Sequence, residues 1–211
     1  MGAVIGFISQ KGGVGKSTLA RALGREAAVG GMTVKIADLD VQQGTSVKWH
    51  LRREEIGIEP RLSVEGFKNA ARALSIAAQY DYLIIDGPAR ASAATLEIAK
   101  AAALVIQPTG SSIDDLEPAV LTFRELVREG IPVRRLVFAL ARIGTDAEES
   151  EARAYILQAG FVALKGSIPE RPAYRQASNI GLAITETRYS QLNKRADTLL
   201  QAMVDMVDGA V

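Results

Sequence analysis

A glycine-rich stretch near the N-terminus decides the fold: Ser9–Thr18 reads S-Q-K-G-G-V-G-K-S-T. It follows an apolar run over 3–8, which is typical of a buried strand, and it leads into Leu19–Leu23 (L-A-R-A-L), a good helix former. A glycine-rich turn between a strand and a helix can point backbone N–H groups inward, and the helix N-terminus adds partial positive charge. The stretch therefore predicts a loop that binds the phosphates of a nucleotide.

Individual residues of this loop have distinct expected roles. The phosphate-binding backbone is expected to comprise Gly12, Gly13, Val14 and Gly15. Lys16 would reach the β- and γ-phosphates, the Ser17 hydroxyl would be a ligand of Mg²⁺, and Thr18 would face the α-phosphate. The strict G-x-x-x-x-G-K-[ST] pattern fails because Gln10 stands where it requires glycine, and the loop carries an additional lysine, Lys11. The alternative is a glycine-rich turn with two solvated lysines.

Acidic residues end two of the predicted strands. Asp38 and Asp40, in A-D-L-D-V-Q, alternate and so fall on one side of the chain, where they could orient a water and hold the hydration shell of a metal. Asp86 ends the apolar run Y-L-I-I-D and would hold Mg²⁺ through water. In a parallel sheet these ends meet the phosphate loop at one edge, where open α/β sheets bind ligands. The alternative for Asp40 and Asp86 is helix capping.

Apolar runs alternate with stretches of helical period along the whole chain, which is the pattern of a mostly parallel sheet with helices on both faces. The expected strands are 3–8, 33–37, 82–85, 103–107, 133–140 and 161–164. The expected helices are 16–29, 43–55, 66–79, 92–101, 114–129, 147–159, 171–178 and 190–207. The loops are short except over 107–113 and 165–170, so we expect a twisted α/β sheet of the P-loop NTPase type in one domain, 1–211.

Composition excludes several classes of chemistry. The chain has no cysteine and one histidine, His50, so disulfides, thiolate nucleophiles, iron–sulfur clusters and Cys/His zinc sites are excluded. Apolar residues make up 48% of the sequence, enough for a sizeable core. Because the apolar runs are far shorter than the roughly 20 residues of a membrane span, we expect a soluble, intracellular protein.

The loop K-G-G-x-G-K-[ST] is the deviant Walker A signature, and with it the chain resembles the ParA/MinD family of ATPases over nearly its whole length. The resemblance implies an ATPase that requires ATP and Mg²⁺. It also implies that Lys11 reaches the phosphates of the partner subunit in a nucleotide-sandwich dimer, as an arginine finger does in trans. Asp40 is then the residue whose loss stops hydrolysis, so the catalytic set is Lys11, Lys16 and Asp40. Many members have proline where this chain has Val41, a departure that leaves the carboxylates in place.

Further residues follow from the same resemblance. Gly87–Ala89 is similar to the switch loop, which rearranges with the state of the γ-phosphate. The adenine base would be held by Arg142, at the end of the sixth strand of the family, and by the loop Ile168–Arg171, in particular Pro169 and Arg171.

Charge is unevenly distributed although the net charge is only +1. Residues 165–195 hold six bases and two acids, whereas 196–211 hold three acids and no base. In the family, basic residues near the C-terminus hold non-specific DNA, and the candidates here are Arg188, Lys194 and Arg195. Arg124 and Arg128, one turn apart on a predicted helix, are a second possibility. The alternative is that these arginines belong to ordinary solvated helix faces.

The last predicted helix carries an apolar stripe formed by Leu192, Ala196, Leu199, Leu200, Met203 and Val207. The stripe most simply packs this helix on the domain. The acids around it disfavour the MinD branch, which ends in a basic membrane-binding helix. The phosphate loop begins within ten residues of Met1, so we expect the short form without an N-terminal helix-turn-helix.

The leading hypothesis is a partition or positioning ATPase. It would dimerise on ATP, hold non-specific DNA of the nucleoid, and be released when a ParB-like, centromere-binding or cargo adaptor stimulates hydrolysis. Its cargo would be a plasmid or a protein assembly, its location cytoplasmic and nucleoid-associated, and no membrane would be involved. The alternatives are a metabolic ligase or synthetase on the same fold, a MinD-like spatial regulator, and a nucleotide-sensing scaffold without appreciable turnover.

Overall fold

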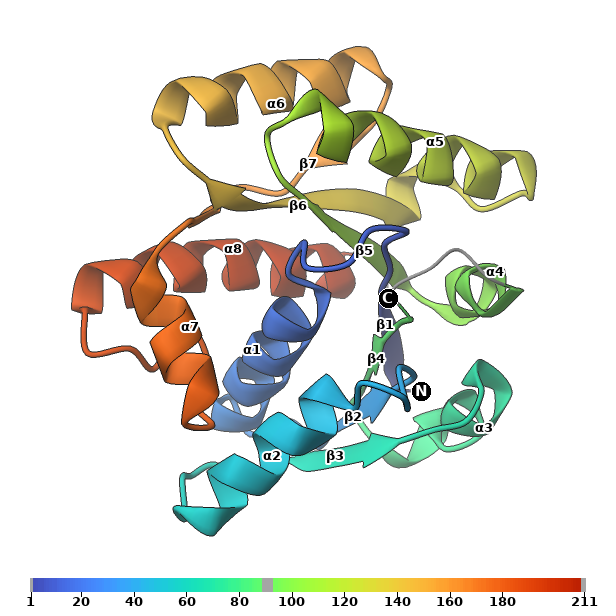
Figure 1. Cartoon of the computed structure of the whole chain (residues 1–211). Coiled ribbons are helices and arrows are strands. Elements are labelled where there is room, and N and C mark those ends of the chain that lie inside the picture. The colour runs from blue at the N-terminus through green and yellow to red at the C-terminus, as the bar shows by residue number, and fades with distance from the viewer. Residues whose placement is uncertain (1, 89–92, 210–211) are drawn as a thin grey trace.

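The structure, a computed structural model, describes residues 2–88 and 93–209. Strands and helices alternate along these residues (Figure 1). The strands are β1 Ala3–Phe7, β2 Val34–Asp38, β3 Ser63–Gly66, β4 Tyr82–Asp86, β5 Leu104–Thr109, β6 Leu136–Ile143, β7 Val162–Ala163 and β8 Ile168–Pro169. The helices are α1 Lys16–Val29, α2 Thr45–Glu55, α3 Ala70–Leu74, α4 Ala93–Ala101, α5 Ile113–Arg128, α6 Asp146–Gln158, α7 Pro172–Asn179 and α8 Ser190–Asp208, with short 3₁₀ turns at Ala77–Gln79 and Val133–Arg135.

The strands form one eight-stranded sheet in the order β3-β2-β4-β1-β5-β6-β7, with β8 paired to β6. All pairings among the described strands are parallel, for instance Phe7 with Asp86 and Asp38 with Asp86. Parallel strands bring their carboxyl ends to the same edge. The loop that follows β1 therefore lies between the ends of β4 and β5, near the centre of the sheet.

Helices cover both faces of the sheet, as the apolar strands predict. On one face, α1, α2, α7 and α8 pack over a core that includes Leu23, Trp49 and Leu200. On the other face, α3 to α6 pack over a second core that includes Ile98 and Phe123. Figure 1 shows α1, α7 and α8 together on one side of the central strands, and α3 and α4 on the other. The predicted fold class, a mostly parallel α/β sheet of the P-loop NTPase type, is confirmed.

The C-terminal helix packs as its apolar stripe predicts. Leu192 of the stripe is partly buried against the core that contains α1. The other five residues are buried there: Ala196, Leu199, Leu200, Met203 and Val207. Within 2–88 and 93–209, no helix has both the length and the apolar character needed to cross a bilayer.

The helix predicted over 66–79 is only partly correct, because this range holds the short helix α3 and a 3₁₀ turn rather than one continuous helix. The edge strand β3, just before it, was not predicted. The strand was missed because Ser63–Gly66 (S-V-E-G) is polar and half exposed at the sheet edge. Asn69 separates the two elements, since its side chain accepts a hydrogen bond from the N–H of Arg72 at 2.9 Å and so caps α3.

Two other boundaries differ from the predictions. The strand expected over 133–140 begins at Leu136, after the 3₁₀ turn, and runs to Ile143. The expected loop 165–170 contains β8, whose two residues pair with the end of β6. Both differences extend the sheet edge toward the carboxyl side, where they supply walls for the site described next.

Candidate functional site

The glycine-rich loop has the backbone that a phosphate-binding turn requires. Gly13 and Gly15 have φ angles of 77° and 107°, in the left-handed region that side chains disfavour. Gly15 is the N-cap of α1, which begins at Lys16 and carries no acidic residue in its first turn. The free N–H groups of that turn and the helix dipole therefore face a site suited to an anion.

A cavity of about 310 Å³ lies in front of this loop. It is lined by Gly12, Gly13, Gly15, Lys16, Ser17, Thr18, Arg21, Asp40, Gln43, Thr45 and Gly87. Lys16 is buried, and its ammonium group makes no hydrogen bond or ion pair with any residue that the structure describes. Burial lowers the pKa of Lys16, while the charges of Asp86 and Asp40 act in the opposite direction. A phosphate placed here would satisfy a cation that the fold itself leaves without a close carboxylate.

Hard oxygen donors gather at one side of this cavity. Asp86 is fully buried, and its Oδ1 has no hydrogen-bond partner among the described residues. Burial raises the pKa of Asp86 to about 6, opposed chiefly by the hydrogen bond from the Ser46 hydroxyl. The Ser17 and Thr45 hydroxyls lie 3.1 Å apart. Carboxylate, hydroxyl and phosphate oxygens are the donors that Mg²⁺ prefers, so Ser17 and Asp86 fit the expected magnesium site.

Asp38 and Asp40 have different surroundings although both end β2. Asp38 is fully buried: its Oδ1 accepts the N–H of Asp40 at 3.0 Å and its Oδ2 accepts the N–H of Ser46 at 2.9 Å. Its carboxylate therefore fixes the start of α2 rather than facing the cavity. Asp40 is partly exposed and lines the cavity, and within the described part of the chain its carboxylate accepts only the N–H of Gln43, at 3.2 Å. Of the two, Asp40 is the carboxylate placed to hold a water.

Lys11 lies at the tip of the loop and outside the residues that line the phosphate-side cavity. Its side chain is half exposed, and its Nζ forms an ion pair with Asp115 in the first turn of α5. The Lys11 N–H also bonds to the Ser9 hydroxyl at 3.0 Å, which shapes the tip. The two lysines of the loop therefore point to different places: Lys16 into its own cavity, and Lys11 across its rim.

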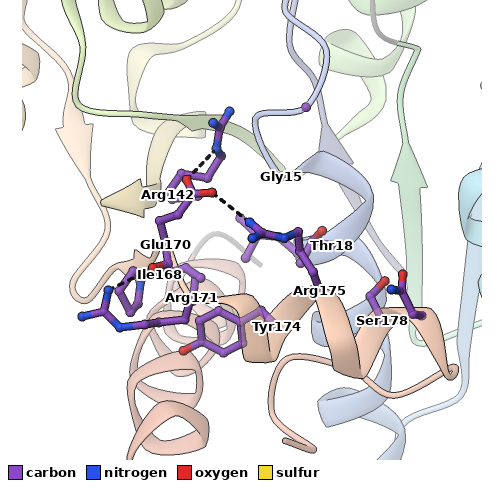
Figure 2. A pocket seen from close by; sticks show the side chains of 14 residues that line it. Gly15, Thr18, Arg142, Ile168, Glu170, Arg171, Tyr174, Arg175 and Ser178 are labelled. Carbon is purple, nitrogen blue, oxygen red and sulfur yellow. Dashed lines mark hydrogen bonds and ion pairs between the residues drawn. The ribbon is translucent and has the colours of Figure 1, made fainter. Parts of the chain in front are cut away.

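A second cavity, of about 530 Å³, adjoins the first and shares Gly13, Gly15 and Thr18 with it. Its other walls come from α1, from the end of β6 and from the segment that runs from β8 through α7. They are formed by Leu19, Ala141, Arg142, Ile168, Pro169, Glu170, Arg171, Tyr174, Arg175, Ser178 and Asn179. Figure 2 shows these side chains around a space open toward Gly15 and Thr18. The volume suits a nucleoside. All the residues expected at the base line this one cavity.

Charged residues form the rim of this base-side cavity. Glu170 accepts hydrogen bonds from Arg142 Nε at 3.1 Å and Arg175 Nη1 at 3.0 Å, the dashed pairs in Figure 2. The hydrogen bond from Arg142 is the main reason that the pKa of Glu170 is lowered. Arg142 has a φ of 60°, unusual for a residue with a side chain, and this backbone turns its guanidinium to the rim. Glu170 lies within the loop Ile168–Arg171 predicted at the base, but its pairing with the two arginines was not predicted.

The DNA candidates lie on two separate surfaces. Arg188, Lys194 and Arg195 are exposed before and along the first turns of α8, whereas Arg124 and Arg128 are exposed on α5. Because α8 and α5 cover opposite faces of the sheet, the two groups cannot form one patch in a single subunit. Arg195 also pairs with Asp146, at 3.6 Å.

Sequence reasoning missed three polar residues on the phosphate side, two of which, Thr45 and Arg21, line the cavity. Thr45 and Ser46 begin α2, and Arg21 lies in the second turn of α1. Ser46 Oγ donates to Asp86 at 2.7 Å, and Arg21 Nε donates to Ser46 Oγ at 3.1 Å. From sequence alone, polar residues at the start of a helix are interpreted as capping residues, and a single arginine in a helix is expected to be exposed. The sequence therefore gave no signal for the hydrogen bonds that join Arg21, Ser46 and Asp86. Ala89 of the expected switch loop lies outside the described residues.

The family of the chain follows from a comparison with models of known protein families. The family model described as the CobQ/CobB/MinD/ParA nucleotide binding domain matches residues 5–184. The chain belongs to this family. The matched range includes the phosphate loop, Asp40, Asp86 and the base-side residues. No curated protein matches the chain in sequence.

Solved structures share the fold. MinD from Pyrococcus horikoshii in complex with Mg-ADP is 19% identical, with a TM-score of 0.77 and coverage of 100% of this chain and 99% of that one. A Cyanothece McdA variant in complex with ATP is 18% identical, with a TM-score of 0.72 and 96% of each chain covered. A putative plasmid partition protein from Borrelia burgdorferi bound to AMPPNP is 17% identical, with a TM-score of 0.73 and coverage of 97% and 99%. At these identities the likeness shows the fold alone.

Proposed function

We propose that this protein is a Mg²⁺-dependent ATPase of the partition or positioning type, which dimerises on ATP. The ATP-bound dimer holds non-specific DNA and releases it after hydrolysis. A ParB-like, centromere-binding or cargo adaptor stimulates that hydrolysis, and the cargo is a plasmid or a protein assembly. In the cell the protein is cytoplasmic and associated with the nucleoid.

The observation that carries this proposal is the separation of the two loop lysines. Lys16 is buried in the cavity of its own subunit, where a phosphate would satisfy it. Lys11 is half exposed, does not line that cavity, and is held at the rim by Asp115. A lysine in this place is free to exchange its intramolecular partner for the phosphates of a second subunit. Such a cation supplied in trans stabilises transition-state charge.

The remaining residues support in-line attack by water on the γ-phosphate. Asp40, which lines the cavity and keeps free lone pairs, orients the water. Lys16 and the first turn of α1 hold the phosphates, and the residues of the 530 Å³ cavity hold the base. Ser17 and, through water, Asp86 would hold Mg²⁺ with the nucleotide, and the ion would neutralise phosphate charge.

We attribute DNA binding to a weak basic patch that is present once in each subunit and therefore twice in the dimer. Arg188, Lys194 and Arg195 give one subunit only a few phosphate contacts, which bind weakly and lose affinity steeply with salt. A dimer offers two such patches, and bivalence raises its affinity without any new contact. Retention on DNA then depends on ATP. Arg124 and Arg128 on α5 serve as the comparison surface.

Co-sedimentation with non-specific DNA tests the proposal. The wild-type chain should sediment with DNA in ATP but not in ADP, and less at higher salt. Asp40→Ala should remain bound in ATP because hydrolysis no longer resolves the dimer. Charge removal at Lys194 and Arg195 should abolish co-sedimentation, whereas removal at Arg124 and Arg128 should not. Binding that is absent, or indifferent to nucleotide, would refute the DNA role.

A further inference from the structure

Arg21 is one of the residues that line the phosphate-side cavity, and it is 6% exposed. Its Nε donates to Ser46 Oγ at 3.1 Å, and its Nη1 donates to Ser178 Oγ at 3.2 Å. Neither partner is a carboxylate, and within the described residues Arg21 forms no ion pair. Burial of a guanidinium without a paired acid costs stability, so its presence calls for an explanation other than packing.

The charges around Arg21 come from the nucleotide site. Burial lowers the pKa of Arg21 to about 10; the charges of Asp86 and Asp38 oppose that change, and Arg52 adds to it. Arg21 therefore remains charged at neutral pH. The acids that keep it charged are the two fully buried carboxylates at the ends of β2 and β4.

Arg21 determines which way the Ser46 hydroxyl points. A hydroxyl has one proton to donate and can also accept. Because Arg21 Nε donates into Ser46 Oγ, the Ser46 proton is free to go to Asp86 Oδ2, 2.7 Å away. The Ser46 main chain is held as well, since its N–H donates to Asp38 at 2.9 Å. Ser46 is thus locked from both sides as a donor to Asp86.

This lock leaves the other oxygen of Asp86 available. Oδ2 is taken by Ser46, whereas the buried Oδ1 has no hydrogen-bond partner among the described residues. A carboxylate that is held through one oxygen keeps its second oxygen in a fixed direction, where it can interact with a metal ion or its water. Partners that orient a metal-site acid in this way matter for affinity nearly as much as the ligands themselves.

We propose that Arg21 is a positioning residue for magnesium: acting through Ser46, it holds Asp86 with Oδ1 turned toward the hydrated ion. The inference rests on the proposed nucleotide-binding function. Through Ser178 at the end of α7, labelled in Figure 2, the same guanidinium also ties the base-side wall to the magnesium side. In this role Arg21 acts through Ser46 and is not itself a ligand of the ion.

The test compares ADP binding with Mg²⁺ and with EDTA, measured by calorimetry on the full chain. Arg21→Met keeps an apolar chain of similar length and removes the donor. We expect the Mg²⁺-dependent gain in ADP affinity to fall roughly tenfold, as for other residues that orient metal ligands. ADP affinity in EDTA should change less than about twofold. Ser46→Ala should reproduce the effect, and the double variant should lose little more, because the two residues act in series.

Arg53→Met is the matched control. Arg53 is also a buried arginine, and like Arg21 its guanidinium lies 5.6 Å from the Trp49 ring centroid, but it pairs with Glu186 instead of Ser46. This variant should unfold at lower temperature and keep the wild-type Mg²⁺ gain.

Several outcomes overturn the inference. One is a folded Arg21→Met with the wild-type Mg²⁺ gain; another is one that loses ADP affinity equally with and without Mg²⁺. If Arg21→Met does not fold, Ser46→Ala decides: an unchanged gain contradicts the relay, and a tenfold loss supports it. A wild-type chain that binds no ADP at all refutes the proposed function itself, which separates the two failures.

Discussion

The two adjoining cavities of the site are built on different physical principles. On the phosphate side, Lys16, Asp38 and Asp86 are buried, and the two carboxylates are held by hydrogen bonds from Ser46. On the base side, the rim consists of side chains about half exposed, with Glu170 between Arg142 and Arg175. The difference indicates where precision is needed: charge must be placed accurately at the phosphates, whereas a base needs mainly a surface of the right shape.

The contrast between the two cavities predicts that substitution of Lys16 has the largest effect, a loss of nucleotide affinity. Lys16→Ala removes the buried cation of the phosphate side, so ATP and ADP affinity should fall roughly 100-fold, the cost of truncating one member of a desolvated charge pair. Lys48→Ala, an exposed lysine on α2, is the control and should leave affinity unchanged. Calorimetry measures both. A loss of less than tenfold in Lys16→Ala would mean that the phosphate side does not depend on this charge.

A smaller effect is expected at Glu186, which ties the segment after α7 to the helices beneath it. Its carboxylate accepts from Arg53 at 2.7 Å, from Arg25 at 3.1 Å and from the N–H of Ala183 at 2.7 Å. Glu186→Gln should reduce the free energy of unfolding by about 2 kcal/mol, less than for complete removal of a buried partner. Urea unfolding at pH 7 measures the difference.

The difference in free energy of unfolding between wild type and Glu186→Gln should depend on pH, and this dependence is the control. Burial tends to raise the pKa of Glu186, but the hydrogen bonds from Arg53 and Ala183 outweigh it and the net pKa is lowered. A lowered native-state pKa means that the stabilisation is complete above the ordinary glutamate value, about 4.3, and is lost as the pH falls through the native-state value. The gap between wild type and variant should therefore close below pH 4. A gap that widens on acidification would contradict the ion-pair account.

The smallest effect is expected at Glu170. Its carboxylate is 43% exposed, and so are large parts of its arginine partners, which screens both ion pairs. Glu170→Gln should change the free energy of unfolding by no more than about 0.5 kcal/mol. Thermal unfolding in low and high salt checks this, with wild type as reference. A loss comparable to that of Glu186→Gln would show that the rim is structural and would remove the contrast between the two cavities.

The same contrast explains what could be predicted from the sequence. Gly13, Gly15 and Lys16 were identifiable because local backbone requirements leave a local pattern. Edge strand β3 was missed because its residues are polar where only one neighbour covers them.

Residues whose role depends on tertiary contact gave no such pattern. Arg21, Ser46 and Asp86 are far apart in the sequence and meet only where α1, α2 and β4 converge. By their alternation in the sequence, Asp38 and Asp40 looked equivalent. In the structure, Asp38 accepts hydrogen bonds from the start of α2, whereas Asp40 lines the cavity.

The central claim is that the two loop lysines serve different subunits. Sedimentation of the wild type, Lys11→Ala and Lys16→Ala with a non-hydrolysable ATP analogue, together with nucleotide affinity, tests it most directly. We expect the wild type to dimerise, Lys16→Ala to lose the nucleotide, and Lys11→Ala to bind the nucleotide with near wild-type affinity while remaining a monomer. If Lys11→Ala lost the nucleotide as Lys16→Ala does, or dimerised like the wild type, Lys11 would not act across a dimer.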